Sequence, residues 1–343
     1  MMKHLMRASS VLALASVVSC GDNALISPTM SPTLASHTIA PSGDAEATEV
    51  SPVLVDMNRQ LAATGAKVRI VKADLMMSAH GWSGATSTEL LANDRARGIG
   101  MEWVPGDPSR DGRVGVTYAA RAVQRFRPYT LDGTAGGRVS NETVAAHIEE
   151  GMQAWRSQKC SSAPMTPVAI APNTDPDLID NLVFTGRPGS WVQPADIVHS
   201  GFLDPNFFLA IGGPNDGPYI LGVTFTLNLV DENGNDLDID NNGKLDIGLA
   251  EIYYNPGWFY WTSVARPNSI DFYSVMTHET GHSLGLNHFG KLFITKHDAA
   301  DGLQIADVKY APYAMMNAAY IDGRNEIAGT DRSSFCQIWA SAK

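Results

Sequence analysis

The 343-residue sequence has little positive charge, few cysteines and no long apolar run in its body. It carries 25 lysines and arginines against 36 aspartates and glutamates, and the resulting net charge of −11 argues against nucleic acid as a partner. No stretch after the first 20 residues is long and apolar enough to cross a bilayer as a helix. Hydrophobic residues make up 44% of the chain, which is enough for a globular core.

Residues 1–20 have the pattern of a bacterial export signal. Lys3 and Arg7 precede a short apolar run over residues 8–18. The run ends in V-V-S-C, which resembles the lipobox of bacterial lipoproteins and implies cleavage before Cys20 and a lipid on its thiol. The alternative is an ordinary secretory signal with an incidental cysteine. The first interpretation predicts an envelope or surface lipoprotein that contacts the membrane only through its lipid.

Three further segments follow the signal. Residues 21–50 are rich in Ser, Pro, Thr and Ala, which is typical of a disordered tether. Residues 51–110 predict a small α+β segment, which is either a removable propeptide or an integral N-terminal subdomain. Residues 111–343 predict a larger domain. In it, Ser140 can cap a helix over 141–159, and residues 220–230 alternate between apolar and polar side chains as a strand does.

Residues 278–288 read H-E-T-G-H-S-L-G-L-N-H. His278 and His282 are four residues apart, so on a helix they lie on one face and can bind one metal ion. Gly285 can adopt a positive φ, which ends the helix. The resulting turn can bring His288 back to the metal as a third ligand. Glu279 can then reach a metal-bound water without binding the metal. Three nitrogen ligands leave a fourth position open, as in a catalytic zinc site; the alternative is an ordinary buried helix with histidines.

This stretch resembles the signature of the metzincin zinc endopeptidases, and residues 249–343 are most similar to the matrixin type. The resemblance implies an α+β catalytic domain with a twisted mixed sheet, an early long helix, an active-site helix, a Met-turn and a C-terminal helix. Met316 is the expected Met-turn residue, with core filling as the alternative. Tyr320 lies four residues past Met316, whereas the catalytic tyrosine of astacins lies two past the Met, so the spacing argues against that role.

Residues 249–256, L-A-E-I-Y-Y-N-P, are similar to the matrixin run L-A-H-A-x-x-P, which is an edge strand above the cleft. The resemblance implies that Ile252, Tyr253 and Tyr254 pair with an extended peptide substrate. Glu251 stands where matrixins have a histidine for a second zinc, so that site is not expected. Residues 51–110 contain no cysteine, which excludes the matrixin device of latency through a propeptide cysteine.

Residues 238–246 begin like a calcium loop, with Gly243 at the sharp turn and oxygen ligands from Asp238, Asp240, Asn242 and Asp246. The glutamate expected at the twelfth position is replaced by Leu249, and a solvated hairpin loop is the alternative. The cysteines that remain after Cys20 are Cys160 and Cys336. In an exported protein they predict a disulfide, with free buried thiols as the alternative.

These observations predict a monomeric, exported, zinc-dependent endopeptidase that cleaves extracellular or periplasmic polypeptides. His278, His282 and His288 are the expected ligands of Zn²⁺, and Glu279 is the expected general base. Ca²⁺ is a second candidate cofactor. The alternative function is a non-catalytic surface lipoprotein that keeps a metalloprotease fold for adhesion or ligand binding.

Overall fold

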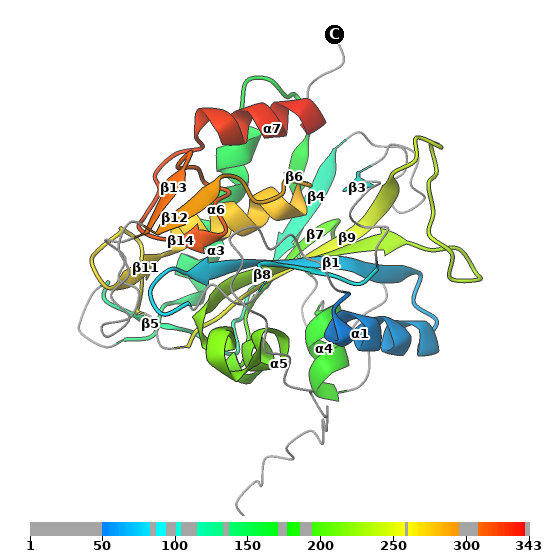
Figure 1. Ribbon diagram of the computed structural model, residues 1–343, viewed down its shortest axis with the longest axis horizontal. Coiled ribbons are helices and arrows are strands. Elements are labelled where there is room, and N and C mark those ends of the chain that lie inside the picture. Colours follow the sequence, from blue (N-terminus) through cyan, green and yellow to red (C-terminus); the bar gives the residue numbers. More distant parts are fainter. Residues whose placement is uncertain are drawn as a thin grey trace, which may run out of the picture. The chain divides into compact units, whose positions relative to one another are not determined.

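A computed structural model of the chain describes residues 50–82, 87–93, 101–103, 115–132, 137–170, 177–185, 194–257, 260–294 and 308–339. The predicted signal with Cys20, and the tether up to residue 49, lie outside the described residues. Residues 38–343 form one compact unit. This unit has an α+β fold, in which six α-helices of the described part flank a mixed sheet (Figure 1).

The main sheet has the order β14-β1-β8-β9-β7-β4-β6, with β2 paired to β1 and β3 paired to β9. Strands β6, β4, β7 and β9 are parallel, whereas β8 is antiparallel to both of its neighbours, β9 and β1. The bounds are β1 (Val68–Ser78), β2 (Glu89–Leu91), β3 (Met101–Glu102), β4 (Val116–Ala120), β6 (Met165–Pro167), β7 (Ile197–Phe202), β8 (Ile220–Leu229), β9 (Leu245–Tyr254) and β14 (Ala319–Tyr320). Two small sheets consist of β11 (Ser269–Asp271), β10 (Tyr260–Thr262) and β5 (Tyr129–Thr130), and of β12 (Lys291–Ile294) and β13 (Val308–Ala311).

The helices divide between the two faces of the main sheet (Figure 1). One apolar cluster contains side chains from α3 (Asn141–Arg156), α6 (Phe272–Ser283) and α7 (Gly329–Trp339). The other contains side chains from α1 (Pro52–Ala63), α4 (Leu178–Thr185) and α5 (Pro205–Asp216), which a 3-10 turn over Gly217–Tyr219 follows. The sheet therefore separates two cores, and α6, which carries the histidine motif, belongs to the first.

The long helix expected after Ser140 is confirmed. The Ser140 hydroxyl accepts a hydrogen bond of 3.1 Å from the Thr143 N–H, which satisfies one of the free donors at the helix start. The helix ends at Arg156, three residues earlier than expected. Its apolar stripe is fully buried and consists of Val144, Ile148, Met152 and Trp155.

The segment over residues 51–110 contributes β1, β2 and β3 to the main sheet. β1 pairs with β8 from Val68–Leu229 to Met77–Ile220, and with β14 at Met77–Ala319. The expected boundary near residue 110 therefore does not divide the chain into two compact units. The described part of this segment thus belongs to the same compact unit as the described part of the larger domain.

The expectation of an edge strand over residues 249–256 is wrong. β9 lies inside the sheet, where Tyr253 is paired with Val223 on one side and Gly201 on the other. Ile252, Tyr253 and Tyr254 are fully buried. Because both backbone edges of β9 are already paired, these three residues have no free edge with which to bind a peptide.

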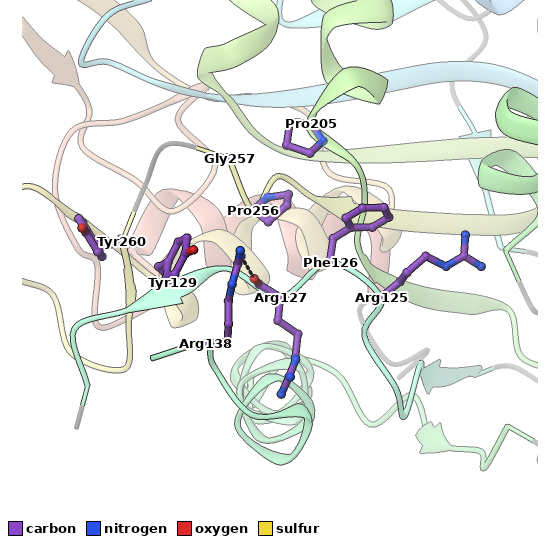
Figure 2. A pocket seen from close by; sticks show the side chains of 9 residues that line it. All are labelled: Arg125, Phe126, Arg127, Tyr129, Arg138, Pro205, Pro256, Gly257 and Tyr260. Carbon is purple, nitrogen blue, oxygen red and sulfur yellow. Dashed lines mark hydrogen bonds between the residues drawn. The ribbon is translucent and has the colours of Figure 1, made fainter. Parts of the chain in front are cut away.

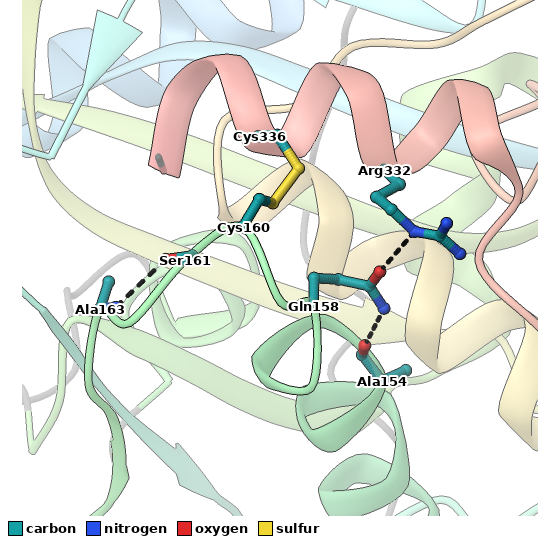
Figure 3. The surroundings of a disulfide bond; sticks show 7 residues. All are labelled: Ala154, Gln158, Cys160, Ser161, Ala163, Arg332 and Cys336. Atoms are coloured by element: carbon teal, nitrogen blue, oxygen red, sulfur yellow. Dashed lines mark hydrogen bonds between the residues drawn. A yellow bond between two sulfur atoms is a disulfide. The ribbon is translucent and has the colours of Figure 1, made fainter. Parts of the chain in front are cut away.

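Cys160, just after α3, and Cys336, on α7, form a disulfide with a Cα–Cα distance of 5.6 Å (Figure 3). Beside it, the Gln158 side chain accepts from Arg332 Nε at 3.0 Å and donates to the Ala154 carbonyl at 2.8 Å. These contacts attach the C-terminal helix to the end of α3. In the described residues, no helix combines the length and the apolar character needed to cross a membrane.

Candidate metal centre

Helix α6 positions the first two histidines of the motif. Its N-terminus is capped by Asp271, whose carboxylate accepts from the Ser274 N–H at 2.8 Å. Gly285 ends the helix with a φ of 91°, and the Leu286 N–H bonds back to the Gly281 carbonyl at 3.0 Å. Only a glycine adopts this conformation without steric cost. The reversal brings His288 back beside the helix, as the sequence predicted.

The three histidines converge through one type of atom. Nε2 of His282 lies 3.0 Å from Nε2 of His278 and 3.1 Å from Nε2 of His288. His278 and His282 are fully buried, whereas His288 is partly exposed. A tetrahedral zinc ion with nitrogen ligands at 2.0–2.1 Å requires ligand separations of about 3.3 Å. The donor set and its spacing therefore fit a zinc ion.

Backbone carbonyls fix the orientation of two of these rings. His278 Nδ1 lies 2.7 Å from the Met315 carbonyl oxygen, and His282 Nδ1 lies 2.8 Å from that of Leu286. A carbonyl oxygen only accepts hydrogen bonds, so both Nδ1 atoms must donate. Each Nε2 is then left with a free lone pair, which is the tautomer that binds a metal.

Burial keeps the three imidazoles uncharged. It lowers the pKa of His278 to about 3. Burial, reinforced by the neighbouring histidines and by Lys72, also places the pKa of His282 well below its usual value. The pKa of His288 shifts in the same direction, again chiefly through burial. Neutral imidazoles at neutral pH are ready to bind a cation without first losing a proton.

Met316 lies directly beneath the motif. A Cβ added at Gly281, between the two helical histidines, would lie 2.4 Å from Met316 Sδ, so only glycine leaves room for the sulfur. Asn317 holds the turn to the residue after His288, because its amide donates to the Phe289 carbonyl at 2.7 Å. The sequence analysis did not identify Asp331 on α7, whose carboxylate accepts from the N–H groups of both Met315 and Met316.

Three tryptophans that the sequence did not connect with the motif also bind α6. Their indole N–H groups donate to carbonyls at the middle and the C-terminal end of the helix, Trp155 to Thr277 at 2.8 Å, Trp103 to Ser283 at 2.9 Å and Trp339 to the C-cap residue Leu284 at 2.9 Å. The last two satisfy carbonyls at the helix end that have no intrahelical partner. The histidine helix is thus fixed by three segments distant in sequence.

Glu279 is fully buried between α6 and the polar face of β8. Its Oε2 accepts from the Thr224 hydroxyl at 2.6 Å, and a Cβ added at Gly222 would lie 2.6 Å from its Oε1. Burial raises the pKa of Glu279 well above its usual value, while Thr224 and the backbone N–H of Met76 on β1 oppose this effect. Oε1 has no hydrogen-bond partner within the described residues. A buried carboxylate oxygen without a partner suits a bound water or the proton of a reacting group.

Tyr320 points away from the histidines. Its hydroxyl donates to the Asp271 carboxylate at 3.0 Å, at the opposite end of α6. Burial raises its pKa. The structure therefore gives Tyr320 a place at the helix cap, in line with the spacing argument against a catalytic role.

The acidic loop between β8 and β9 brings three carboxylates together. One oxygen each from Asp238, Asp240 and Asp246 lies within 4.8 Å of the others. The Asn242 amide nitrogen donates to Glu102, a residue that the loop pattern did not include, and Asn242 Oδ1 accepts from the Lys244 N–H at 2.8 Å. Asp238 accepts from the N–H groups of Asn242 and Gly243, which shapes the turn. The three aspartates could hold a divalent cation, and the same hydrogen bonds are also those of a polar turn.

A pocket of about 580 Å³ lies elsewhere, beyond the carboxyl ends of β4, β7 and β9 (Figure 2). It is lined by Arg125, Phe126, Arg127, Tyr129, Arg138, Pro205, Pro256, Gly257 and Tyr260, none of which belongs to the histidine motif. The Arg138 guanidinium stacks on the Tyr129 ring at 3.8 Å and donates to the Arg127 carbonyl. Arg138 therefore serves as part of the pocket wall.

Comparison of the chain with models of known protein families, and with curated proteins, found no match.

Proposed function

We propose that this chain is a zinc-dependent endopeptidase of the metzincin type. The observation that carries the proposal is the convergence of three histidine Nε2 atoms next to Glu279, whose Oε1 lacks a hydrogen-bond partner in the described part of the chain. The order of α3, the mixed sheet, α6, the turn at Met316 and α7 supports the proposal, because the metzincin resemblance implies these elements in this order.

His278, His282 and His288 would hold Zn²⁺, which supplies Lewis acidity toward a water and the scissile carbonyl. Glu279 takes a proton from the attacking water and passes it to the leaving amine. The Thr224 hydroxyl occupies Oε2, which leaves Oε1 for that proton. Met316 supports α6 and takes no part in the chemistry.

The proposed substrates are extracellular or periplasmic polypeptides, because the first 20 residues have the pattern of an export signal. The proposed form is a monomer attached to the cell envelope by a lipid on Cys20. The three aspartates of the 238–246 loop are the proposed ligands of Ca²⁺.

One observation favours the alternative of a non-catalytic surface protein. Glu279 and two of the three histidines are fully buried, although an endopeptidase must admit a polypeptide to this carboxylate. The test must therefore distinguish a closed enzyme from a protein that never cleaves.

The test combines metal analysis with cleavage of a mixed peptide library, before and after limited digestion by a second protease that is then inhibited. We expect one zinc per chain, and cleavage that falls by about 10²–10⁴-fold in Glu279→Gln. His282→Ala should lose the zinc, whereas His80→Ala, which changes an exposed histidine outside the motif, should retain it. Bound zinc without Glu279-dependent cleavage in either sample would contradict the endopeptidase and favour the surface protein.

A further inference from the structure

β1 turns a polar face toward the metal centre because of one extra residue. Val71 lies between the pairs Ile70–Leu227 and Lys72–Thr226, which is a β-bulge that reverses the alternation of side chains. Beyond it, Ala73, Leu75 and Met77 join the apolar cluster that contains α1. Lys72, Asp74 and Met76 consequently face α6 on the other side of the sheet.

Each of these three residues reaches the histidine motif. Lys72 Nζ donates to Asn287 Oδ1 at 2.7 Å, directly before the third histidine. Asp74 pairs with Lys72 at 2.8 Å, and its Oδ2 lies 3.7 Å from His282 Nδ1. Met76 is paired with Gly222, where an added Cβ would lie 2.6 Å from Glu279 Oε1, so β1 passes beside this carboxylate.

β1 also takes the only backbone edge of β8 that β9 leaves open. β8 pairs with β9 on one side and with β1 on the other, and β1 runs antiparallel to it along its whole length (Figure 1). An extended peptide that binds to a sheet edge near Glu279 would need this same edge. With β1 in place, Glu279, His278 and His282 have no exposed surface.

We propose that β1 is a gate that occupies the peptide-binding edge of β8 and must leave it before a polypeptide can reach Glu279. This inference rests on the proposed endopeptidase function. Within the described residues, the outer edge of β1 is paired over shorter stretches than the edge that faces β8, with the three residues of β2 and the two residues of β14, although most β1 side chains are buried. Its buried Lys72–Asp74 ion pair adds little to stability compared with apolar residues of similar size, so the pair is better explained by its contacts with the site.

The test loosens β1 in the full-length, zinc-loaded chain. Met76→Pro places a proline in a paired strand and removes the N–H near Glu279. Lys72→Met removes the contact with Asn287. Arg69→Ala is the matched control, because Arg69 lies on the same strand and donates to the carbonyls of Ala66 and Val68 at its far end. The readouts are the affinity for a peptidyl hydroxamate, which binds zinc, hydrogen exchange of the β1 amides, and peptide cleavage.

Both loosened variants should bind the hydroxamate at least about tenfold more tightly than the wild type, because apparent affinity scales with the fraction of open molecules. Arg69→Ala should match the wild type. Saturating hydroxamate should increase the hydrogen exchange of the β1 amides in the wild type. This measurement tests whether β1 leaves β8 even if Met76→Pro does not fold.

Unchanged hydroxamate affinity in the folded, zinc-loaded Lys72→Met variant, together with β1 amides that stay protected when the wild type binds the hydroxamate, would overturn the gate. If the wild type cleaves peptides while its β1 amides stay protected from hydrogen exchange, the gate is wrong and the proposed endopeptidase function is retained. Tighter hydroxamate binding in the variants without cleavage by any form would support the gate and contradict the endopeptidase.

Discussion

The backbone N–H of Met316 donates a hydrogen bond of 3.0 Å to the buried carboxylate of Asp331. The same carboxylate accepts from the Met315 N–H at 2.8 Å, and the Met315 carbonyl in turn accepts from His278 Nδ1 at 2.7 Å. One side chain on α7 thus holds the turn that orients the first histidine of the candidate metal centre.

Replacing this carboxylate should weaken both the fold and the metal site. Asp331→Ala leaves the N–H groups of Met315 and Met316 without a partner, and we expect the free energy of unfolding to fall by about 2–4 kcal/mol. Zinc affinity should fall by about 10–100-fold, as is usual when the support of a ligand is lost. Urea unfolding and a competitive zinc titration would measure the two effects. Asp322→Ala is the control, because Asp322 is exposed and should change stability by no more than about 0.5 kcal/mol.

Stability should depend on pH through Glu251. Burial raises the pKa of Glu251 to about 8, although its carboxylate accepts from the N–H groups of Leu178 and Ile179 at the start of α4. The folded state therefore binds a proton that the unfolded state has already lost, and stability should decline between about pH 5 and pH 8, by at most about 1.4 kcal/mol per pH unit. Urea unfolding of the wild type and of Glu251→Gln at several pH values would test this. Equal slopes in the two proteins would show that Glu251 is not the responsible group.

Loss of the disulfide should destabilise the chain. A double variant with serine at positions 160 and 336 should unfold with about 2–5 kcal/mol less free energy, because the bond constrains a long loop of the unfolded state. Thermal unfolding with and without a reductant provides the measurement. The reductant should lower the melting temperature of the wild type and leave that of the double variant unchanged.

Calcium should stabilise the folded chain if the loop over residues 238–246 binds it. At a concentration about 100-fold above the dissociation constant, the gain is about 2.7 kcal/mol. Asp240→Asn should reduce the gain, whereas Glu232→Gln, which changes an exposed residue in the neighbouring turn, should not. An unfolding midpoint that is insensitive to CaCl₂ in the wild type would favour a plain polar turn.

The features that local sequence could predict were those with a local cause. The cap at Ser140 and the stripe from Val144 to Trp155 depend on residues within one helix. The strand over 220–230 was likewise evident from its alternation, and its polar face proved to lie against Glu279 through Thr224. The return of His288 depends on Gly285, a nearby residue with a recognisable role.

The features that the sequence could not predict depend on which segments lie side by side. Nothing in residues 249–256 indicates that β9 has a neighbour on both sides, because strand order is set by the whole sheet. The bulge at Val71 decides which face of the sheet Lys72 joins, and no residue pattern marks it. The contacts of Asp331 with Met316 and of Trp103 with Ser283 join positions that are close only after folding.

The bond between Cys160 and Cys336 closes the intervening chain into a covalent ring. His278, Glu279, His288 and Met316 all belong to this ring, whereas β1 lies outside it. A cut in the chain between β1 and β4 would therefore break the covalent link between β1 and the ring without opening the ring. A cut inside the ring would leave both pieces joined through sulfur. The covalent topology thus divides the molecule into a part that one cut can disconnect and a part that one cut leaves joined.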